Sequence, residues 1–287
     1  MPIKLIWPTA PRYSIFLRSK KNATSTLLMN FKHILAFVFC LFIYASPVNA
    51  QQRLQDPNTV VWAASLNTVY LAKHVSVWAE YQWRREDFVR NWQQSMPRVG
   101  LQYHFNNGVS VMAGYAHILT FPYGEYPAGP HKIPEHRIFE QVIWNGNIGR
   151  VGLNHRLRLE QRFLGKVDQK SEDGDVTDWI YVNRLRYQLR MTIPLNHSQL
   201  QDKTWYILPY DEIFIGFGPN VNQNIFDQNR AGLMLGYNLN KVFKIEGGLF
   251  NQTLQQGGLV AGKEVIQYNS GFILNVYLTK PFGKKAK

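Results

Sequence analysis

Hydrophobic and polar residues alternate along much of this chain with a period of two. From residue 150 to residue 163, five charged side chains share one phase: Arg150, Arg156, Arg158, Glu160 and Arg162. The opposite phase is mainly apolar. Because successive side chains of a β-strand point to opposite faces, the pattern predicts a strand with one charged and one apolar face. A soluble sandwich would turn the charged face to water, whereas a membrane barrel would turn it to the lumen.

Similar strand-like runs recur along the chain, and no stretch after residue 50 shows the apolar stripe of a helix. Eleven runs can be read: 59–70, 73–84, 96–105, 109–119, 137–145, 150–163, 179–191, 205–218, 229–239, 242–251 and 265–278. Tilted membrane strands need about 9–11 residues to cross a bilayer, which these runs supply. We therefore predict an all-β fold, a transmembrane antiparallel up-and-down β-barrel.

Bacterial single-chain barrels have an even number of strands, so eleven runs do not close the count. A strand hidden within 84–95 would give about twelve strands, which we favour. If the first run is not a strand, the alternative is ten.

The connections between the runs alternate in length. Short turns rich in Asn and Gly tolerate positive φ and lie at 106–108, 145–147 and 240–241. Longer polar loops are expected at 85–95, 120–136, 164–178, 219–228 and 252–264. This asymmetry is typical of the periplasmic and extracellular ends of outer-membrane barrels, and it places both termini in the periplasm. The long connection 192–203 is the exception, because it falls on the short side.

Residues 1–50 resemble a secretory leader. An unbroken apolar run of 11 residues, 34–44, follows Lys32 and precedes a small-residue stretch that ends at Ala50. The run is too short for a membrane-spanning helix, which needs about 20 residues. It predicts a signal peptide cleaved after Ala50, with Met29 as an alternative start, and a single barrel domain over 51–287.

Cysteine and charge limit the possible functions. The only cysteine, Cys40, lies in the leader, so residues 51–287 can form neither a disulfide nor a Cys-based metal site. The leader holds six of the 32 basic residues and none of the 19 acids, so the net charge falls from +13 to +7 after cleavage. Because the remaining basic residues are spread at strand period, we expect no nucleic-acid partner.

The polar phase defines a charged lumen face. We assign to it Glu80, Arg84, Arg98, Arg137, Gln141, Arg156, Arg158, Glu160, Arg162, Arg184, Arg186, Arg190, Glu212, Arg230 and Glu246. Two interpretations stay open. Arg and Glu can form a structural cross-strand network that fills a narrow lumen. Alternatively, the excess of Arg on runs 150–163 and 179–191 can supply a positive, porin-like path for small anionic solutes.

Other chemistry has weaker support. His74 and Ser76 share a face, as in some outer-membrane lipid hydrolases, but Val77 stands where such a motif expects Asn. The acidic segment 171–178 does not match a calcium loop, and His131, Glu135 and His136 make a poor metal site with Pro134 between them. We expect no catalytic residue, cofactor or metal, and no enzyme activity.

Several segments together carry a family resemblance: 78–84 (WAEYQWR), 135–141 (EHRIFEQ), 156–163 (RLRLEQRF), 184–187 (RLRY) and 227–230 (DQNR). The chain resembles domain-of-unknown-function family 2490, a set of exported outer-membrane barrels. One departure is Asp211-Glu212, where Asn-Glu is expected. The resemblance implies a barrel in the Gram-negative outer membrane and no established activity. Its partners would be membrane lipid, lipopolysaccharide and the outer-membrane assembly machinery; an alternative function is surface interaction through the long loops.

Overall fold

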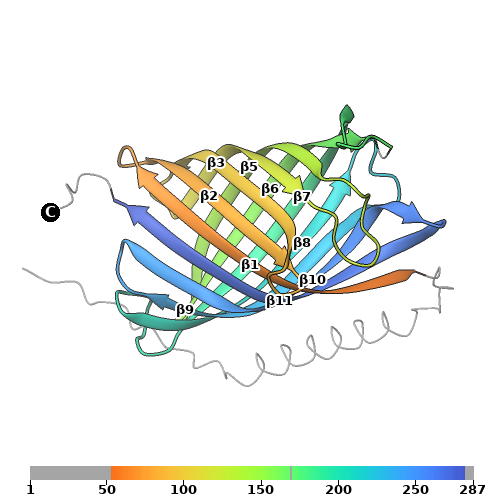
Figure 1. Cartoon of the computed structure of the whole chain (residues 1–287). Coiled ribbons are helices and arrows are strands. Elements are labelled where there is room, and N and C mark those ends of the chain that lie inside the picture. Colours follow the sequence, from red (N-terminus) through yellow and green to blue (C-terminus); the bar gives the residue numbers. More distant parts are fainter. Residues whose placement is uncertain (1–52, 169, 282–287) are drawn as a thin grey trace, which may run out of the picture. The chain divides into compact units, whose positions relative to one another are not determined.

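The computed structural model describes residues 53–168 and 170–281, which form one closed β-barrel (Figure 1). Its eleven strands are β1 (Leu54–Tyr70), β2 (Val75–Glu86), β3 (Asn91–His104), β4 (Val109–Thr120), β5 (Ile133–Ile148), β6 (Val151–Val167), β7 (Val176–Pro194), β8 (Thr204–Phe217), β9 (Phe226–Asn238), β10 (Phe243–Val260) and β11 (Lys263–Lys280). Consecutive strands pair antiparallel around the wall. The described part of the chain holds no apolar helix of the length that a bilayer crossing needs.

The all-β barrel predicted from the alternation is confirmed, and each of the eleven runs corresponds to one strand. The strand number is eleven rather than the even number that we favoured. Segment 84–95 holds no extra strand, because β2 and β3 continue through it to a turn at 87–90. The first run is a genuine strand, since β1 pairs with both β2 and β11. The signal-peptide prediction concerns residues outside those described.

An odd number of strands makes the closing pair parallel. Leu54 lies opposite Val265 at the start of this β1–β11 seam, and Val69 lies opposite Lys280 at its end. Chain direction reverses at each antiparallel step, so the first and last of eleven strands point the same way. Leu54 and Lys280 therefore lie at opposite ends of the barrel, and the expectation that both termini share one side is wrong.

The two ends differ in their connections. The short-turn end carries 71–74, 105–108, 149–150, 195–203 and 239–242, and the long-loop end carries 87–90, 121–132, 168–175, 218–225 and 261–262. Two of the predicted long loops are wrong, because strand pairing continues through most of 85–95 and 252–264. Pairs such as Glu86 with Asn91 and Leu259 with Glu264 carry the hairpins toward their tips. Polar side chains do not prevent such pairing, since the backbone makes it.

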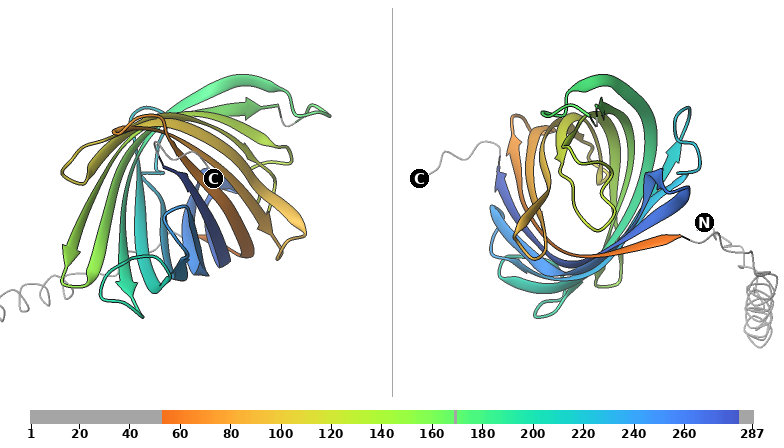
Figure 2. Two further views of the ribbon diagram at one scale, coloured as in Figure 1. Left: turned by 90° about the vertical axis from the view of Figure 1, so that its left-hand side faces the viewer. Right: turned by 45° about the vertical axis from the view of Figure 1, so that its right-hand side comes forward.

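The loop 121–132 folds into the barrel instead of standing above it. In the right-hand view of Figure 2 it lies within the outline of the wall. The Tyr123 hydroxyl donates to Gln267 Oε1 at 2.7 Å, and the Asp56 carboxylate accepts the backbone N–H of Glu125 at 3.0 Å. Gly124 adopts φ +77° beside Asp56, where any side chain would collide with the carboxylate. These contacts hold the loop across the long-loop end.

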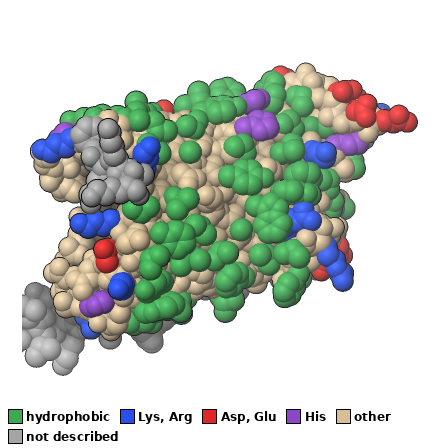
Figure 3. Space-filling view, turned by 60° about the vertical axis from the view of Figure 1, so that its left-hand side comes forward, with side chains coloured by type: hydrophobic (Ala, Val, Ile, Leu, Met, Phe, Trp, Pro, Cys, Tyr) green, Lys and Arg blue, Asp and Glu red, His purple; other side chains and the backbone are tan. Residues whose placement is uncertain are grey.

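The outer wall is apolar and the inner wall is largely polar. Figure 3 shows hydrophobic side chains over the middle of one face, with most charged ones near the two ends. Leu233 and Leu249 are neighbours on β9 and β10, yet 56% and 69% of their surfaces are exposed. Inside, buried apolar residues form only small clusters, such as Val60, Trp62 and Phe250. The buried inner positions are otherwise dominated by Arg, Glu, Gln and Asn.

Candidate functional site

The centre of the lumen is built around one carboxylate, Glu160, near the middle of β6. Its side chain has 0% exposure. Arg186 and Arg184 on β7 lie 2.6 Å and 2.7 Å from its oxygens, and Arg137 on β5 lies 3.3 Å away. Arg158, two residues along β6, is more distant at 3.9 Å. Short charge-assisted hydrogen bonds of this kind are how a buried carboxylate is stabilised.

The same arginines extend the network to neighbouring strands. Arg186 and Arg156 both bind Glu212 on β8, at 2.7 Å and 2.8 Å. Arg137 and Arg162 share Glu135, at 2.6 Å and 2.9 Å. The network thus runs without a break from β5 across β6 and β7 to β8. It arises because the period-two pattern gives each of these strands a charged inner phase.

Two further clusters lie on either side of this network. Arg190 contacts Glu246 at 2.5 Å, and the hydroxyls of Tyr206 and Tyr277 donate to the same carboxylate at 2.8 Å and 2.7 Å. On the other wall, Arg98 and Glu80 form a pair at 3.3 Å. Each of these carboxylates therefore has a cationic partner, whereas Asp56, buried on β1 at the mouth of the barrel, accepts hydrogen bonds from backbone N–H groups and from Gln267.

The reverse does not hold, because cations outnumber carboxylates. Among the described residues, eleven cationic side chains line the barrel body: Arg84, Arg98, Arg137, Arg156, Arg158, Arg162, Arg184, Arg186, Arg190, Arg230 and Lys244. Below the mouth of the barrel, where Asp56 and Glu264 are buried, six carboxylates face them: Glu80, Glu135, Glu160, Glu212, Asp227 and Glu246. The excess is five positive charges. It is not spread evenly, as two of the arginines have no carboxylate partner within the described ranges.

These two are Arg84 on β2 and Arg230 on β9. Arg84 donates to the amide oxygens of Gln82, at 2.7 Å, and Gln94, at 2.9 Å. Arg230 donates to Gln228 Oε1 at 3.0 Å. Both guanidiniums also face the ring of Trp62, with their Cζ atoms 3.6 Å and 5.0 Å from its centroid. Amides and an aromatic ring orient a guanidinium favourably but carry no negative charge, and the nearest carboxylates, Glu80 and Glu212, act on Arg84 and Arg230 only from beyond ion-pair distance.

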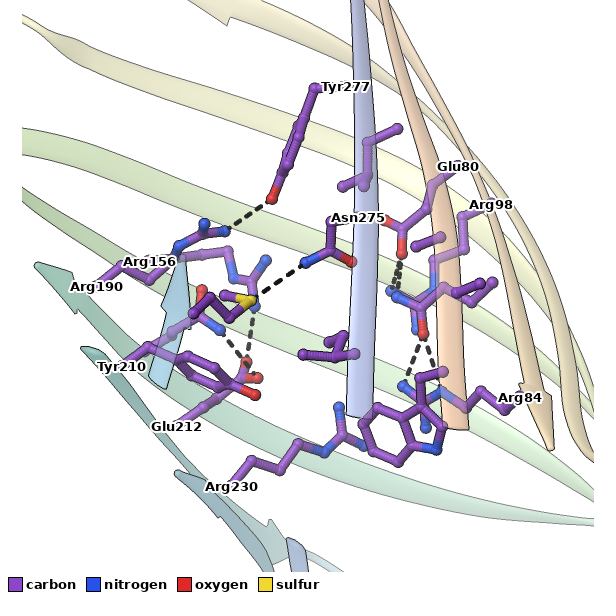
Figure 4. Close-up of a pocket in the computed structure, with 18 of the residues that line it drawn as sticks. Glu80, Arg84, Arg98, Arg156, Arg190, Tyr210, Glu212, Arg230, Asn275 and Tyr277 are labelled. Atoms are coloured by element: carbon purple, nitrogen blue, oxygen red, sulfur yellow. Dashed lines mark hydrogen bonds and ion pairs between the residues drawn. The ribbon is translucent and has the colours of Figure 1, made fainter. Parts of the chain in front are cut away.

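Two cavities meet at these arginines. The central cavity, about 90 Å³ in volume, is drawn in Figure 4 with Arg84 and Arg230 reaching into it from different walls. A vestibule of about 590 Å³ lies toward the long-loop end and is lined by residues of loops 121–132 and 218–225. Arg84, Arg98, Arg186 and Arg230 line both spaces. They therefore form the floor of the vestibule.

The structure places all the lumen residues assigned from the sequence on the inner wall. The ambiguous segment 135–141 turns Arg137 and Gln141 inward, and Gln141 accepts two hydrogen bonds from Arg158. Sequence reasoning missed Glu135 and Asp227, which pair with Arg162 and with Arg184. Glu135 is two residues from Arg137 and so shares its phase, a signal that was present. Asp227 precedes the predicted run 229–239 and gave no comparable signal.

The hydrolase candidate has a different geometry from the one its sequence suggested. Ser76 Oγ is hydrogen-bonded to His104 Nε2 at 2.8 Å, whereas His74 Nδ1 lies 2.9 Å from the His104 carbonyl oxygen. His74 and Ser76 are therefore not partners. The Ser76 side chain is fully buried, with 0% exposure, so its hydroxyl has no open approach for a lipid ester.

The weaker metal candidates are likewise separated. Glu135 points inward into ion pairs, while His136 contacts the Tyr115 hydroxyl at 2.5 Å on the outer face. In the acidic loop, Ser171 donates to Asp175 at 3.0 Å. Within the described ranges, no group of three or more His, Cys, Asp or Glu side chains is placed to hold a metal ion.

Comparison with known proteins gives one family match. The model of the family described as "Protein of unknown function (DUF2490)" matches residues 59–260, which reach from the middle of β1 to the end of β10. No curated protein and no solved structure matches the chain.

Proposed function

This chain belongs to the DUF2490 family of proteins of unknown function, and for it we propose an outer-membrane β-barrel whose lumen is closed by its own ion pairs. The barrel would act as a passive, structural element of the membrane. The observation that carries the closed lumen is Glu160, fully buried among four arginines near the middle of its strand.

The apolar outer wall supports the membrane location. Soluble monomers rarely expose contiguous apolar patches larger than a few hundred Å², because such patches drive association. Here Leu233 of β9, Leu249 of β10 and Phe272 of β11 form one exposed row across three paired strands. Lipid and the acyl chains of lipopolysaccharide would cover this surface, and the predicted leader would bring the chain to the assembly machinery.

The polar inner wall supports the closed lumen. A barrel of this size is narrow enough for side chains to fill much of its interior. Arg186 contacts Glu160 and Glu212 at once, so it ties β6 and β8 through β7. Loop 121–132 also covers part of the long-loop end. A hydrated ion would have to break buried ion pairs to pass.

Conductance in a planar bilayer tests this proposal. The refolded, heat-modifiable protein should insert and produce no steady current, while an open trimeric porin in the same bilayer serves as the positive control. A steady current carried by the folded barrel would overturn the closed lumen.

The excess of five cationic side chains favours a second candidate, a narrow path for small anions. A ring of Arg supplies the positive field that anion pores use. The same bilayer experiment separates the two: a steady current with an anion-selective reversal potential, reduced by Arg156→Ala with Arg186→Ala, would establish the path.

A further inference from the structure

We propose that the floor of the vestibule is a binding site for a small tetrahedral oxyanion, phosphate or sulfate, held between Arg84, Arg98 and Arg230. Such a site would bind its anion whether or not the barrel lies in a membrane and whether or not its lumen conducts.

Arg84 and Arg230, at the floor of the vestibule, carry positive charge that no carboxylate contacts directly among the described residues. Arg84 is buried, with 3% exposure, and its hydrogen bonds go to neutral amide oxygens. Arg230 likewise donates to an amide oxygen, and neither has a carboxylate partner among the described residues. A buried charge without a counter-charge is strongly unfavourable, so isolated buried cations are rare in proteins. A bound anion would supply the missing counter-charge.

Two guanidinium N–H groups of residues that line the central cavity lack an acceptor among the described residues. Arg98 Nε and Arg156 Nε are buried and have no hydrogen-bond partner within the described part of the chain. Both arginines line the central cavity, and Arg98 also lines the vestibule. Buried N–H groups nearly always find an acceptor, because leaving one unsatisfied costs free energy. Oxyanion oxygens are acceptors that fit such donors.

Arginines outnumber carboxylates around the central cavity. Six arginines line it, namely Arg84, Arg98, Arg156, Arg186, Arg190 and Arg230, against two carboxylates, Glu80 and Glu212. Both carboxylates are already engaged, Glu80 by Arg98 and Glu212 by Arg156 and Arg186. Figure 4 shows the pairs Glu80–Arg98 and Glu212–Arg156 at the sides of the cavity, with Arg84 and Arg230 facing the space between.

The guanidiniums of Arg84 and Arg230 are held in place by their neighbours before any ligand binds. Trp62 lies against the guanidiniums of both Arg84 and Arg230, and Phe214 lies 4.7 Å from Arg230 Cζ. Trp62 is itself fixed, because its indole N–H donates to Gln93 Oε1 at 2.6 Å. Rings and amides orient the two guanidinium forks in advance, which lowers the entropy cost of binding. Planar forks of this kind match the paired oxygens of phosphate and sulfate.

The size of the space limits the ligand. A cavity of about 90 Å³ has room for a few water molecules, each of which occupies about 30 Å³ in the liquid. A small oxyanion fits this space. The ligand would arrive through the vestibule, whose floor the same arginines form. The site would therefore fill from the long-loop end.

Calorimetry on the refolded full barrel in detergent tests the proposal, with inorganic phosphate and sodium sulfate as separate probes. We expect saturable binding of at least one of them and a rise in the unfolding temperature, because a ligand that binds only the native state stabilises it. Sodium chloride at matched ionic strength is the control for screening. Equal stabilisation by chloride, or no saturable binding of either oxyanion, would overturn the site.

Arg230→Gln should weaken oxyanion binding by about tenfold or more, since it removes a charged hydrogen-bond donor. Arg230→Lys keeps the charge but loses the planar guanidinium, so it should bind the oxyanion with intermediate affinity. It also serves as the test variant if Arg230→Gln does not fold. Arg90→Gln is the matched control, because Arg90 is exposed in the 87–90 turn and pairs only with Asp87 at 3.1 Å. Unchanged oxyanion affinity in the Arg230 variants that fold would refute the site. Because no current is measured, the result is independent of whether the lumen conducts.

Discussion

Arg184 on β7 and Asp227 on β9 lie 2.7 Å apart, although β8 separates their strands. Arg184 also binds Glu160 on β6, so a single guanidinium joins three strands. The lumen network is therefore not a set of ladders between neighbouring strands. It crosses the interior and ties together parts of the wall that share no backbone hydrogen bonds.

Glu160→Gln should be strongly destabilising, because it leaves four arginines around a neutral amide. Removing one partner of a buried ion pair costs about 3 to 5 kcal/mol. We expect a loss of this size in the free energy of unfolding, measured by urea titration of the barrel in lipid vesicles. Glu172→Gln is the control, since Glu172 is exposed in loop 168–175 and should change stability by about 0.5 kcal/mol or less. Equal losses in both variants would contradict the central role of Glu160.

Leu233→Arg tests the membrane location directly. Leu233 is exposed near the middle of β9, so in a membrane the new charge would face lipid. An arginine at the bilayer midplane costs about 2 to 4 kcal/mol, whereas on a soluble surface it costs little. We expect reduced insertion into vesicles and lower stability there. Ile225→Arg, in loop 218–225, should insert like the wild type. If Leu233→Arg also inserts normally, the apolar wall does not face lipid.

The parallel seam predicts that Leu54, at the start of β1, and Lys280, at the end of β11, lie on opposite sides of the proposed membrane. Since Cys40 is the only cysteine and cleavage of the predicted leader would remove it, single-cysteine variants of the cleaved protein report on one position each. Arg53→Cys, just before the start of β1 at the long-loop end, should react with a membrane-impermeant maleimide on intact cells. Lys241→Cys, in the turn beside the end of β11, should react only after the outer membrane is opened. Labelling of both variants on intact cells would contradict this topology.

Asp56→Ala should release the inward-folded loop. The Asp56 carboxylate accepts backbone N–H groups of Glu125 and Tyr126 and the side-chain amide of Gln267, all at the mouth of the barrel. Without it, residues 121–132 lose their main anchor on β1. Amide hydrogen exchange in this loop should become faster by about tenfold or more, because one such charged contact is worth roughly 1.5 to 3 kcal/mol. Asp173→Ala, in the exposed loop 168–175, should leave the exchange of 121–132 unchanged.

Much of the fold was predictable because alternation is a local property. Strand identity and inner phase follow from period two, and so the inner placement of Arg156, Arg158 and Glu160 could be read directly. The extent of the loops could not, because polar hairpins such as 252–264 pair through their backbones. The even strand number of bacterial single-chain barrels led us to favour twelve strands where the barrel has eleven. That even number is a general regularity and not a physical constraint on this chain.

Partnerships inside the lumen were beyond the sequence for a different reason. Which arginine meets which carboxylate depends on strand register and barrel tilt, and these are set by the whole wall. The contact of Arg184 with Asp227 skips a strand, and Ser76 meets His104 instead of its sequence neighbour His74. Neither pairing is encoded in local spacing.

The seam between β1 and β11 also governs how the chain can fold. Leu54 and Val265 meet only after all the intervening residues have been placed, and contacts so distant in sequence are slow to form. Until then, both edge strands offer unpaired backbone groups to other chains. A polypeptide that stops before β11 would keep these edges permanently and be prone to aggregate. β11 is therefore the strand that closes the sheet into a barrel and removes its two free edges.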